Sequence, residues 1–92
     1  MNLRKLARGR DCMIRSPVCC FDSDTTVLCH LNGAGMGRKH HDLVAAWGCS
    51  SCHAWVDGGY AKAGYSKDER DLAHLRGMQR TLEALIDDGV IG

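Results

Sequence analysis

Aromatic residues are scarce in this chain of 92 residues, which has one phenylalanine, two tyrosines and two tryptophans. Proline occurs once, at position 17. A domain this short buries a modest apolar core, and small domains often gain stability from cross-links or bound metals. The length predicts one domain over residues 1–92. We expect its six cysteines to supply the stability that the core lacks.

Long apolar runs are also missing. No stretch approaches the roughly 20 apolar residues that a membrane-spanning helix needs. A basic segment, residues 1–11, opens the sequence, but no apolar run follows it as in a signal peptide. We therefore expect a cytoplasmic protein that does not bind a membrane. Disulfides are disfavoured in the reducing cytosol, so clustered cysteines are more often metal ligands there.

The charges are unevenly distributed, although the formal net charge is only +1. Residues 1–15 contain five basic side chains and one acidic side chain, whereas residues 66–92 contain four basic and six acidic ones. A basic end can lie along the phosphates of a nucleic acid. A solvated basic tail is the alternative that charge alone leaves open.

Local patterns predict a strand, a loop and a short helix. β-branched residues and alternation favour a strand over residues 25–31, after a turn at residues 22–24. Residues 33–37 hold three glycines and predict a loop. A short helix is expected to open in the segment 49–53 and to fade at Gly58 and Gly59.

A longer helix is predicted over residues 66–88. Ser66 and Glu69 form a capping-box pattern, and Gly89 is a suitable stop. The simplest interpretation of the helix is that its apolar stripe packs against the core, with a dimer seam as the alternative. His74 is expected at the surface of the helix. The stripe recurs at helical spacing and comprises Leu72, Leu75, Met78 or Gln79, Leu82, and Leu85 or Ile86.

The strongest local signal is the pair Cys49-x-x-Cys52. Two intervening residues let both sulfurs turn towards one zinc ion, with Zn–S distances near ~2.3 Å. Cys12 and Cys19 are the expected second pair. Cys20 is an equally acceptable ligand by spacing. Because adjacent side chains usually point in different directions, only one of Cys19 and Cys20 should bind.

A closed site of four sulfurs would be structural, contributing to folding rather than activating water. The alternatives are a redox Cys-x-x-Cys pair, disulfides and buried free thiols. The redox alternative is weakened because the sequence lacks a thioredoxin-like βαβ pattern. Cys29 lies within the predicted apolar strand and is expected to be a small core residue.

Two histidines and an aspartate indicate a second site. On a helix His53 and Asp57 are four residues apart and share one face, so they could hold one divalent cation. His30 ends the predicted strand and could lie opposite that cation. A histidine near a metal is the arrangement that deprotonates water for attack on a phosphodiester. Taken singly, each residue could equally be a hydrogen-bonded core or surface side chain.

The order of these residues resembles the HNH nuclease pattern: a strand histidine, a central polar residue, and Cys-x-x-Cys-His followed by a polar residue four positions later. That match runs from about Cys12 to Asp57. More narrowly, the sequence resembles the small prophage-encoded proteins of the YbcO-like family, which are assigned as nucleases. This resemblance is carried by residues 5–12, 25–31, 42–53 and 87–91.

The resemblance implies a small α+β domain of the ββα-metal (HNH-like) type, stapled by zinc, with a β-hairpin, a short helix and a long C-terminal helix. In that family the hairpin and helix hold one catalytic metal, here Mg²⁺ or Mn²⁺. By position, His30 would be the general base and Asp42 would orient it. His53 and Asp57 would be ligands of the catalytic cation. The implied phosphate contacts are Arg4, Lys5, Arg8, Arg38 and Lys39.

Two positions depart from the family pattern. Cys29 precedes His30 where many members have an acidic or histidine ligand, and Asp42 replaces the central asparagine. A thiol is a poor Mg²⁺ ligand, because hard cations prefer oxygen. Paired His40 and His41 in the basic loop could touch phosphate or substitute in the metal site.

Two functions are therefore expected from different classes. The first is a metal-dependent endonuclease that hydrolyses DNA phosphodiesters in phage or prophage recombination or DNA processing. The alternative is a non-catalytic zinc module that binds DNA or a recombination partner. The sequence sets no expectation for the oligomeric state.

Overall fold

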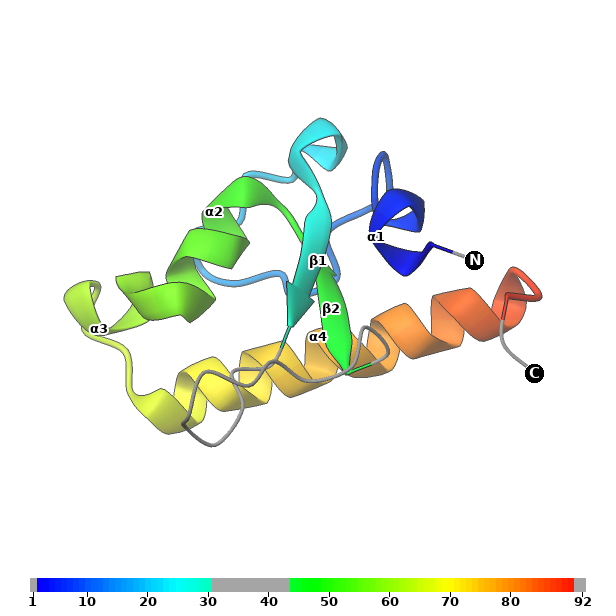
Figure 1. Ribbon diagram of the computed structural model, residues 1–92. Coiled ribbons are helices and arrows are strands. Elements are labelled where there is room, and N and C mark those ends of the chain that lie inside the picture. The colour runs from blue at the N-terminus through cyan, green and yellow to red at the C-terminus, as the bar shows by residue number, and fades with distance from the viewer. Residues whose placement is uncertain (1, 31–43, 91–92) are drawn as a thin grey trace.

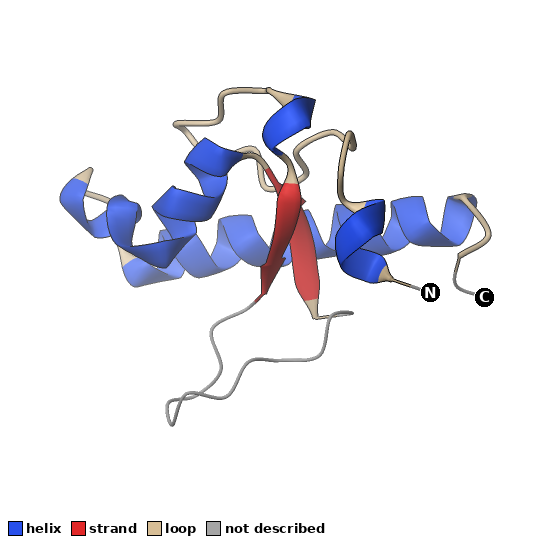
Figure 2. Ribbon diagram, turned by 45° about the horizontal axis from the view of Figure 1, so that its top comes forward, coloured by secondary structure: helices blue, strands red, loops and turns tan. Residues whose placement is uncertain are grey.

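The computed structural model describes residues 2–30 and 44–90 and shows a small α+β fold in which a two-stranded hairpin lies across a long helix (Figure 1). In Figure 2 the hairpin stands between the short N-terminal helix α1 and the α2–α3 region, with α4 running behind it. The elements in chain order are α1 (Leu3–Leu6), the 3₁₀ turn η1 (Ser23–Thr25), β1 (Val27–His30), β2 (Ala45–Gly48), α2 (Ser50–Ala54), the π-helical turn η2 (Trp55–Gly59), α3 (Tyr60–Lys62) and α4 (Lys67–Asp87).

Strands β1 and β2 pair antiparallel, with Leu28 opposite Trp47 and His30 opposite Ala45. All four residues of β2 are buried, because α4 and the chain before η1 cover this strand. The backbone of Trp47 is satisfied on the edge away from β1: its N–H donates to Thr81 Oγ1 at 3.0 Å, and its carbonyl accepts from Met13 N at 2.7 Å. Side-chain and loop contacts thus complete a sheet of two strands.

Helix α4 begins as the sequence predicts. Ser66 Oγ accepts from Glu69 N at 3.1 Å, and the Glu69 carboxylate accepts from Ser66 N at 3.0 Å. This reciprocal capping box satisfies two backbone donors at the start of the helix. The helix then runs for 21 residues and ends at Asp87, next to Gly89 with φ at 75°.

The face of α4 that packs on the core coincides only in part with the predicted apolar stripe. The buried residues of the helix are His74, Gly77, Thr81 and Leu85, whereas Leu72, Leu75 and Ile86 of the stripe are exposed. Gly77 allows this packing, because a Cβ atom there would lie 2.9 Å from Ile14 Cα. Within the predicted stripe, Met78 packs against the core, Leu82 is half-buried and Leu85 is buried. The packing interpretation therefore holds for the C-terminal part of the stripe and is wrong at Leu72 and Leu75.

The segment after β2 contains two short helices separated by a kink. The first opens at Ser50 and passes through the turn η2, and the second ends at Lys62. Gly58 has a φ of 146° and is not helical, so the first helix breaks where the sequence predicts. Trp55 and Val56 from this turn join the core beside Ile14. Among the described residues, no helix is both long and apolar enough to cross a membrane.

Candidate functional site

Four cysteine sulfurs meet at one point of the core. Cys12 and Cys19 come from the chain between α1 and η1, and Cys49 and Cys52 come from the start of α2. All four Sγ atoms lie within 4.8 Å of one another, with 3.5 Å between Cys12 and Cys52 and 3.8 Å between Cys19 and Cys49. A tetrahedral zinc ion with Zn–S bonds of ~2.3 Å holds its sulfurs roughly 3.8 Å apart. This group could therefore hold a metal such as zinc.

Hydrogen bonds at the start of α2 and from Ser16 position two of these sulfurs. Cys49 is the N-cap of α2, and its Sγ accepts from Cys52 N at 3.5 Å. Ser16 lies 3.4 Å from Cys52 Sγ through its N–H and 3.1 Å through its hydroxyl oxygen. Backbone donors around sulfur favour its thiolate form, which is the form that binds metals. These contacts hold the sulfurs close to one another, so that the cluster could bind one metal ion.

Contacts within the cluster shift the pKa values of its thiols. The contact between Cys12 and Cys52 lowers the pKa of Cys12 to about 4 and raises the pKa of Cys52. Burial raises the pKa of Cys19 to about 11. A bound ion would replace the thiol protons of its ligands.

The two remaining cysteines lie outside this group. Cys20 is exposed, with its Sγ 4.0 Å from Thr25 Oγ1, so the chain turns Cys19 and not Cys20 towards the cluster. Cys29 is fully buried, as the sequence predicts, and burial raises its pKa to about 12. Its Sγ contacts the carbonyl oxygen of Val27 at 3.8 Å.

A second arrangement is a surface hollow of about 300 Å³ that both candidate histidines line. His30 enters from the end of β1 and His53 from α2, directly after Cys52. Arg4 and Arg8, from α1 and the turn after it, line the same hollow. The other lining residues are Thr26, Val27 and Leu28. The hollow therefore combines two imidazoles with two guanidinium groups.

Asp57 is exposed on η2 and is not among the residues that line this hollow. Within residues 2–30 and 44–90, the cysteine cluster is the only group of three or more His, Cys, Asp or Glu side chains that could hold a metal. His53 and Asp57 do not form a second such group there. Lys5 is exposed on α1. The other predicted site residues, Asp42, Arg38, Lys39, His40 and His41, lie outside the described part of the chain.

His74 was expected at the surface but is buried between α4 and the hairpin. Its Nε2 lies 2.9 Å from the carbonyl oxygen of Cys29. Burial lowers the pKa of this imidazole, so the neutral ring donates the hydrogen bond. The contact joins the long helix to the residue directly before His30. A helical phase anchored on Gly77 would have placed His74 on the packing face.

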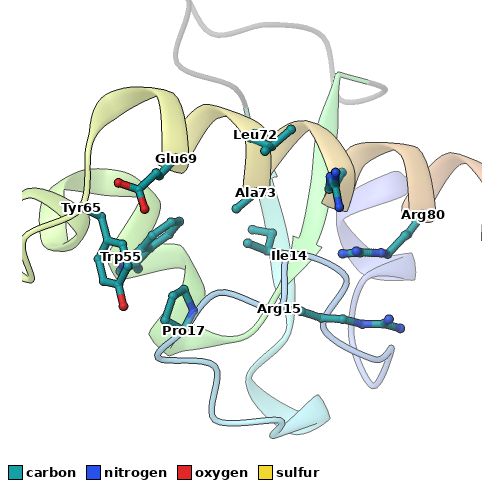
Figure 3. Close-up of a pocket in the computed structure, with 10 residues that line it drawn as sticks. Ile14, Arg15, Pro17, Trp55, Tyr65, Glu69, Leu72, Ala73 and Arg80 are labelled. Carbon is teal, nitrogen blue, oxygen red and sulfur yellow. The ribbon is translucent and has the colours of Figure 1, made fainter.

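A third feature is a groove of about 390 Å³ between α4 and the chain around Ile14. Figure 3 shows Trp55, Tyr65 and Pro17 on one side of it and Arg15 and Arg80 on the other. Among the residues that the structure describes, no histidine or cysteine lines this groove. The hollow at His30 and His53 is therefore the better candidate for hydrolytic chemistry.

Comparisons with known proteins agree over nearly the whole chain. A family model described as "Putative nuclease YbcO" matches residues 1–90. Two proteins of that description, from Escherichia coli K12 and Enterobacteria phage 82, are each 41% identical over 96 residues, covering 98% of this chain and 96% of the relative. A solved structure of a "putative bacteriophage protein" from E. coli K-12 superposes with a TM-score of 0.79 at 35% identity, covering 96% of this chain and 100% of that one.

Proposed function

The chain belongs to the "Putative nuclease YbcO" family, and on that premise we propose that it is a metal-dependent nuclease of the HNH type that hydrolyses DNA phosphodiesters. The observation that carries this proposal is the hollow shared by His30, His53, Arg4 and Arg8. Imidazoles can move protons near neutral pH, and guanidinium groups bind phosphate oxygens. Both kinds of group are needed to cleave a phosphodiester.

In this proposal His30 is the general base. Its imidazole takes a proton from a water molecule, whose oxygen then attacks the phosphorus. The bond from phosphorus to the leaving oxygen breaks, and a proton from solvent neutralises that oxygen. Arg4 and Arg8 hold the non-bridging oxygens and offset their negative charge. A positioned general base supplies about 10²-fold to 10⁴-fold in rate.

The proposal includes a catalytic cation, for which the described residues of the hollow do not form a complete set of ligands. A bound Mg²⁺ or Mn²⁺ would stabilise charge on the phosphoryl group and the leaving oxygen. Hard cations prefer oxygen ligands, and no carboxylate lines the hollow among the described residues. His53 is the proposed nitrogen ligand, with Asp57 and Asp42 as the proposed carboxylates. The proton transfer assigned to His30 does not depend on which residues bind the cation.

The cysteine cluster is joined to the hollow through the start of α2. His53 directly follows Cys52, and His53 N donates to the Cys49 carbonyl oxygen at 2.9 Å. A zinc ion on the four sulfurs would fix this turn and therefore the direction from which His53 enters. We propose this structural role for zinc, bound by Cys12, Cys19, Cys49 and Cys52. We also propose a biological setting in phage or prophage DNA recombination or processing, which the origin of one relative in Enterobacteria phage 82 supports.

The test is DNA cleavage with Mg²⁺ or Mn²⁺ by the wild-type protein, His30→Ala and His53→Ala. We expect each variant to lose about 100-fold or more of the activity. Lys67→Ala, at an exposed position at the start of α4, is the matched control and should cleave normally. Bound zinc is measured in every sample, which separates loss of chemistry from loss of folding. Equal cleavage by all four proteins would remove both histidines from the mechanism.

A second candidate function is a non-catalytic zinc module that binds DNA or a recombination protein. It is favoured by the buried thiol of Cys29 at the position before His30, where it offers the hollow no oxygen ligand. This candidate predicts no cleavage with any cation. It also predicts salt-sensitive DNA binding that weakens when Arg4, Lys5 and Arg8 are replaced by alanine. Cleavage that depends on His30 would exclude it.

A further inference from the structure

One face of α4 carries large apolar side chains that the protein leaves exposed. Leu72, Leu75 and Ile86 are 54%, 51% and 55% exposed. These are half of the six large hydrophobic residues that are exposed among the described residues. Monomeric soluble proteins rarely leave contiguous apolar patches uncovered, and such patches commonly mark an interface.

The spacing of these residues identifies the kind of partner. With Gln79 and half-buried Leu82 between them, they follow intervals of three, four, three and four residues. This is the heptad repeat of positions a and d, which pairs one helix with another helix. We define the α4 seam as Leu72, Leu75, Gln79, Leu82 and Ile86. It spans about 21 Å of helix at ~1.5 Å per residue.

The seam is separate from the face that packs on the core. The core-facing residues Gly77 and Thr81 lie on the other side of the helix, against Ile14 and β2. No residue of α4 lines the hollow that contains His30 and His53. A partner on the seam would therefore leave that hollow open, and the inference does not depend on the proposed nuclease activity.

Charge argues against nucleic acid as the occupant of the seam. From Ser66 to Val90 the chain has six acidic and four basic side chains, which would repel a phosphate backbone. Three charges flank the seam, at Asp71, Arg76 and Glu83, and the first two meet with opposite signs in the register of a parallel pair. In the heptad, Asp71 takes position g and Arg76 takes the following position e, which meet across a parallel coiled coil.

We propose that α4 pairs in parallel with α4 of a second copy of this chain. The apolar seam residues then meet their own counterparts, and the two Gln79 amides hydrogen-bond to each other across the seam. A single polar residue at position a is known to fix register in this way. Asp71 faces the second copy's Arg76, and only one of its carboxylate oxygens is engaged by Arg70 within the chain.

The experiment is sedimentation equilibrium of the full chain over a range of protein concentrations. We expect the wild type to dimerise and Leu75→Glu to raise the dimer dissociation constant about tenfold or more, because a charge enters the seam. Ile86→Glu should do the same. Phe21→Glu is the matched control: Phe21 is 77% exposed but lies in the chain before η1, so its dissociation constant should not change.

A wild type that stays monomeric at the highest concentrations would overturn the proposal, and so would equal weakening by Phe21→Glu. Circular dichroism of each variant checks that the helix is intact. Orientation is tested by exchanging charges. Asp71→Arg and Arg76→Asp should each weaken the dimer, and together they should restore it. Restoration by Arg76→Glu with Glu83→Arg instead would indicate an antiparallel pair and overturn the parallel arrangement.

Discussion

His74 Nε2 lies 2.9 Å from the carbonyl oxygen of Cys29, although the two residues are 45 positions apart in the chain. The contact satisfies a backbone acceptor of β1 on the side that faces α4. Its neighbour His30 lines the hollow proposed to cleave DNA. An imidazole on the long helix therefore contacts the strand end that carries the proposed base, and in the proposed mechanism His74 would be a positioning residue.

The burial of His74 predicts how stability depends on pH. Burial is the main cause that lowers the pKa of His74, and Arg70 adds to it. The hydrogen bond to the Cys29 carbonyl, Asp71 and Asp57 oppose the shift but do not cancel it. As pH falls below about 6.5, the unfolded chain takes up a proton before the folded protein does. The free energy of unfolding should therefore fall, by at most ~1.4 kcal/mol per pH unit.

The control for the pH effect is His74→Gln, whose amide can still donate to Cys29. Urea unfolding of both proteins is compared at pH 7.5 and pH 5.5. The difference between wild type and variant removes acid effects that they share, including protonation of the cysteine cluster. An identical fall in both proteins would show that His74 does not cause it.

The cysteine cluster predicts a metal stoichiometry. We expect one zinc ion per chain in the wild type and in Cys20→Ser, because Cys20 lies outside the cluster. Cys49→Ser should lose the ion and much of its stability, since structural zinc contributes directly to folding. Elemental analysis of the purified proteins gives the zinc content. Retention of zinc by Cys49→Ser with loss from Cys20→Ser would reverse the assignment.

Gly77 predicts an unusual response to alanine. Alanine normally favours a helix over glycine by about 0.8–1.0 kcal/mol. At this position its Cβ would lie 2.9 Å from Ile14 Cα, so the helix must move away from the chain beneath it. We expect Gly77→Ala to destabilise the protein by about 1–3 kcal/mol. Thermal unfolding measures this, with Glu83→Ala on the exposed face as the near-neutral control.

Leu85 and Ile86 are adjacent and of similar size, but they lie on different faces of α4. Leu85 is buried against Ala7 and Trp47, whereas Ile86 is exposed. Leu85→Ala should cost about 2–5 kcal/mol of unfolding free energy, and Ile86→Ala under about 1 kcal/mol. Chemical denaturation is performed at low protein concentration, so that any pairing through the α4 seam does not contribute. Equal costs would contradict the packing face seen in the structure.

Features encoded over a few residues could be predicted from the sequence. The capping box of α4 needs only Ser66 and Glu69, and both of its hydrogen bonds are present. The burial of Cys29 also follows from local alternation in a strand. The proximity of Cys12 to Cys52 could be expected, because tetrahedral coordination needs a second pair of ligands.

Features that depend on the path of the backbone could not be predicted. Spacing does not distinguish Cys19 from Cys20 as the cluster member. That choice is made by a loop in which Arg15 and Phe21 both have positive φ values, at 53° and 55°. Arginine and phenylalanine do not predict a positive φ, because non-glycine residues adopt this conformation rarely.

The packing face of α4 could not be predicted from the sequence for a different reason. Its buried positions include His74, Gly77 and Thr81, which an apolar pattern does not select. Each of these residues makes a contact with the neighbouring chain that an apolar side chain of ordinary size could not make. His74 and Thr81 hydrogen-bond to backbone groups of the hairpin, and Gly77 allows Ile14 to approach. Leu72 and Leu75, which begin the apolar pattern, are exposed on the face of the helix that points away from the core.

The cysteine cluster also bears on how the hairpin can vary. Cys19 precedes β1 and Cys49 follows β2, so an ion shared by their sulfurs would tie the two strands together at the end opposite the connector between His30 and Ala45. Doubling the length of a flexible loop costs only about 0.6 kcal/mol once its ends are held. Insertions and deletions in that connector should therefore be tolerated without loss of strand register, because the opposite end of the hairpin would hold the two strands in place.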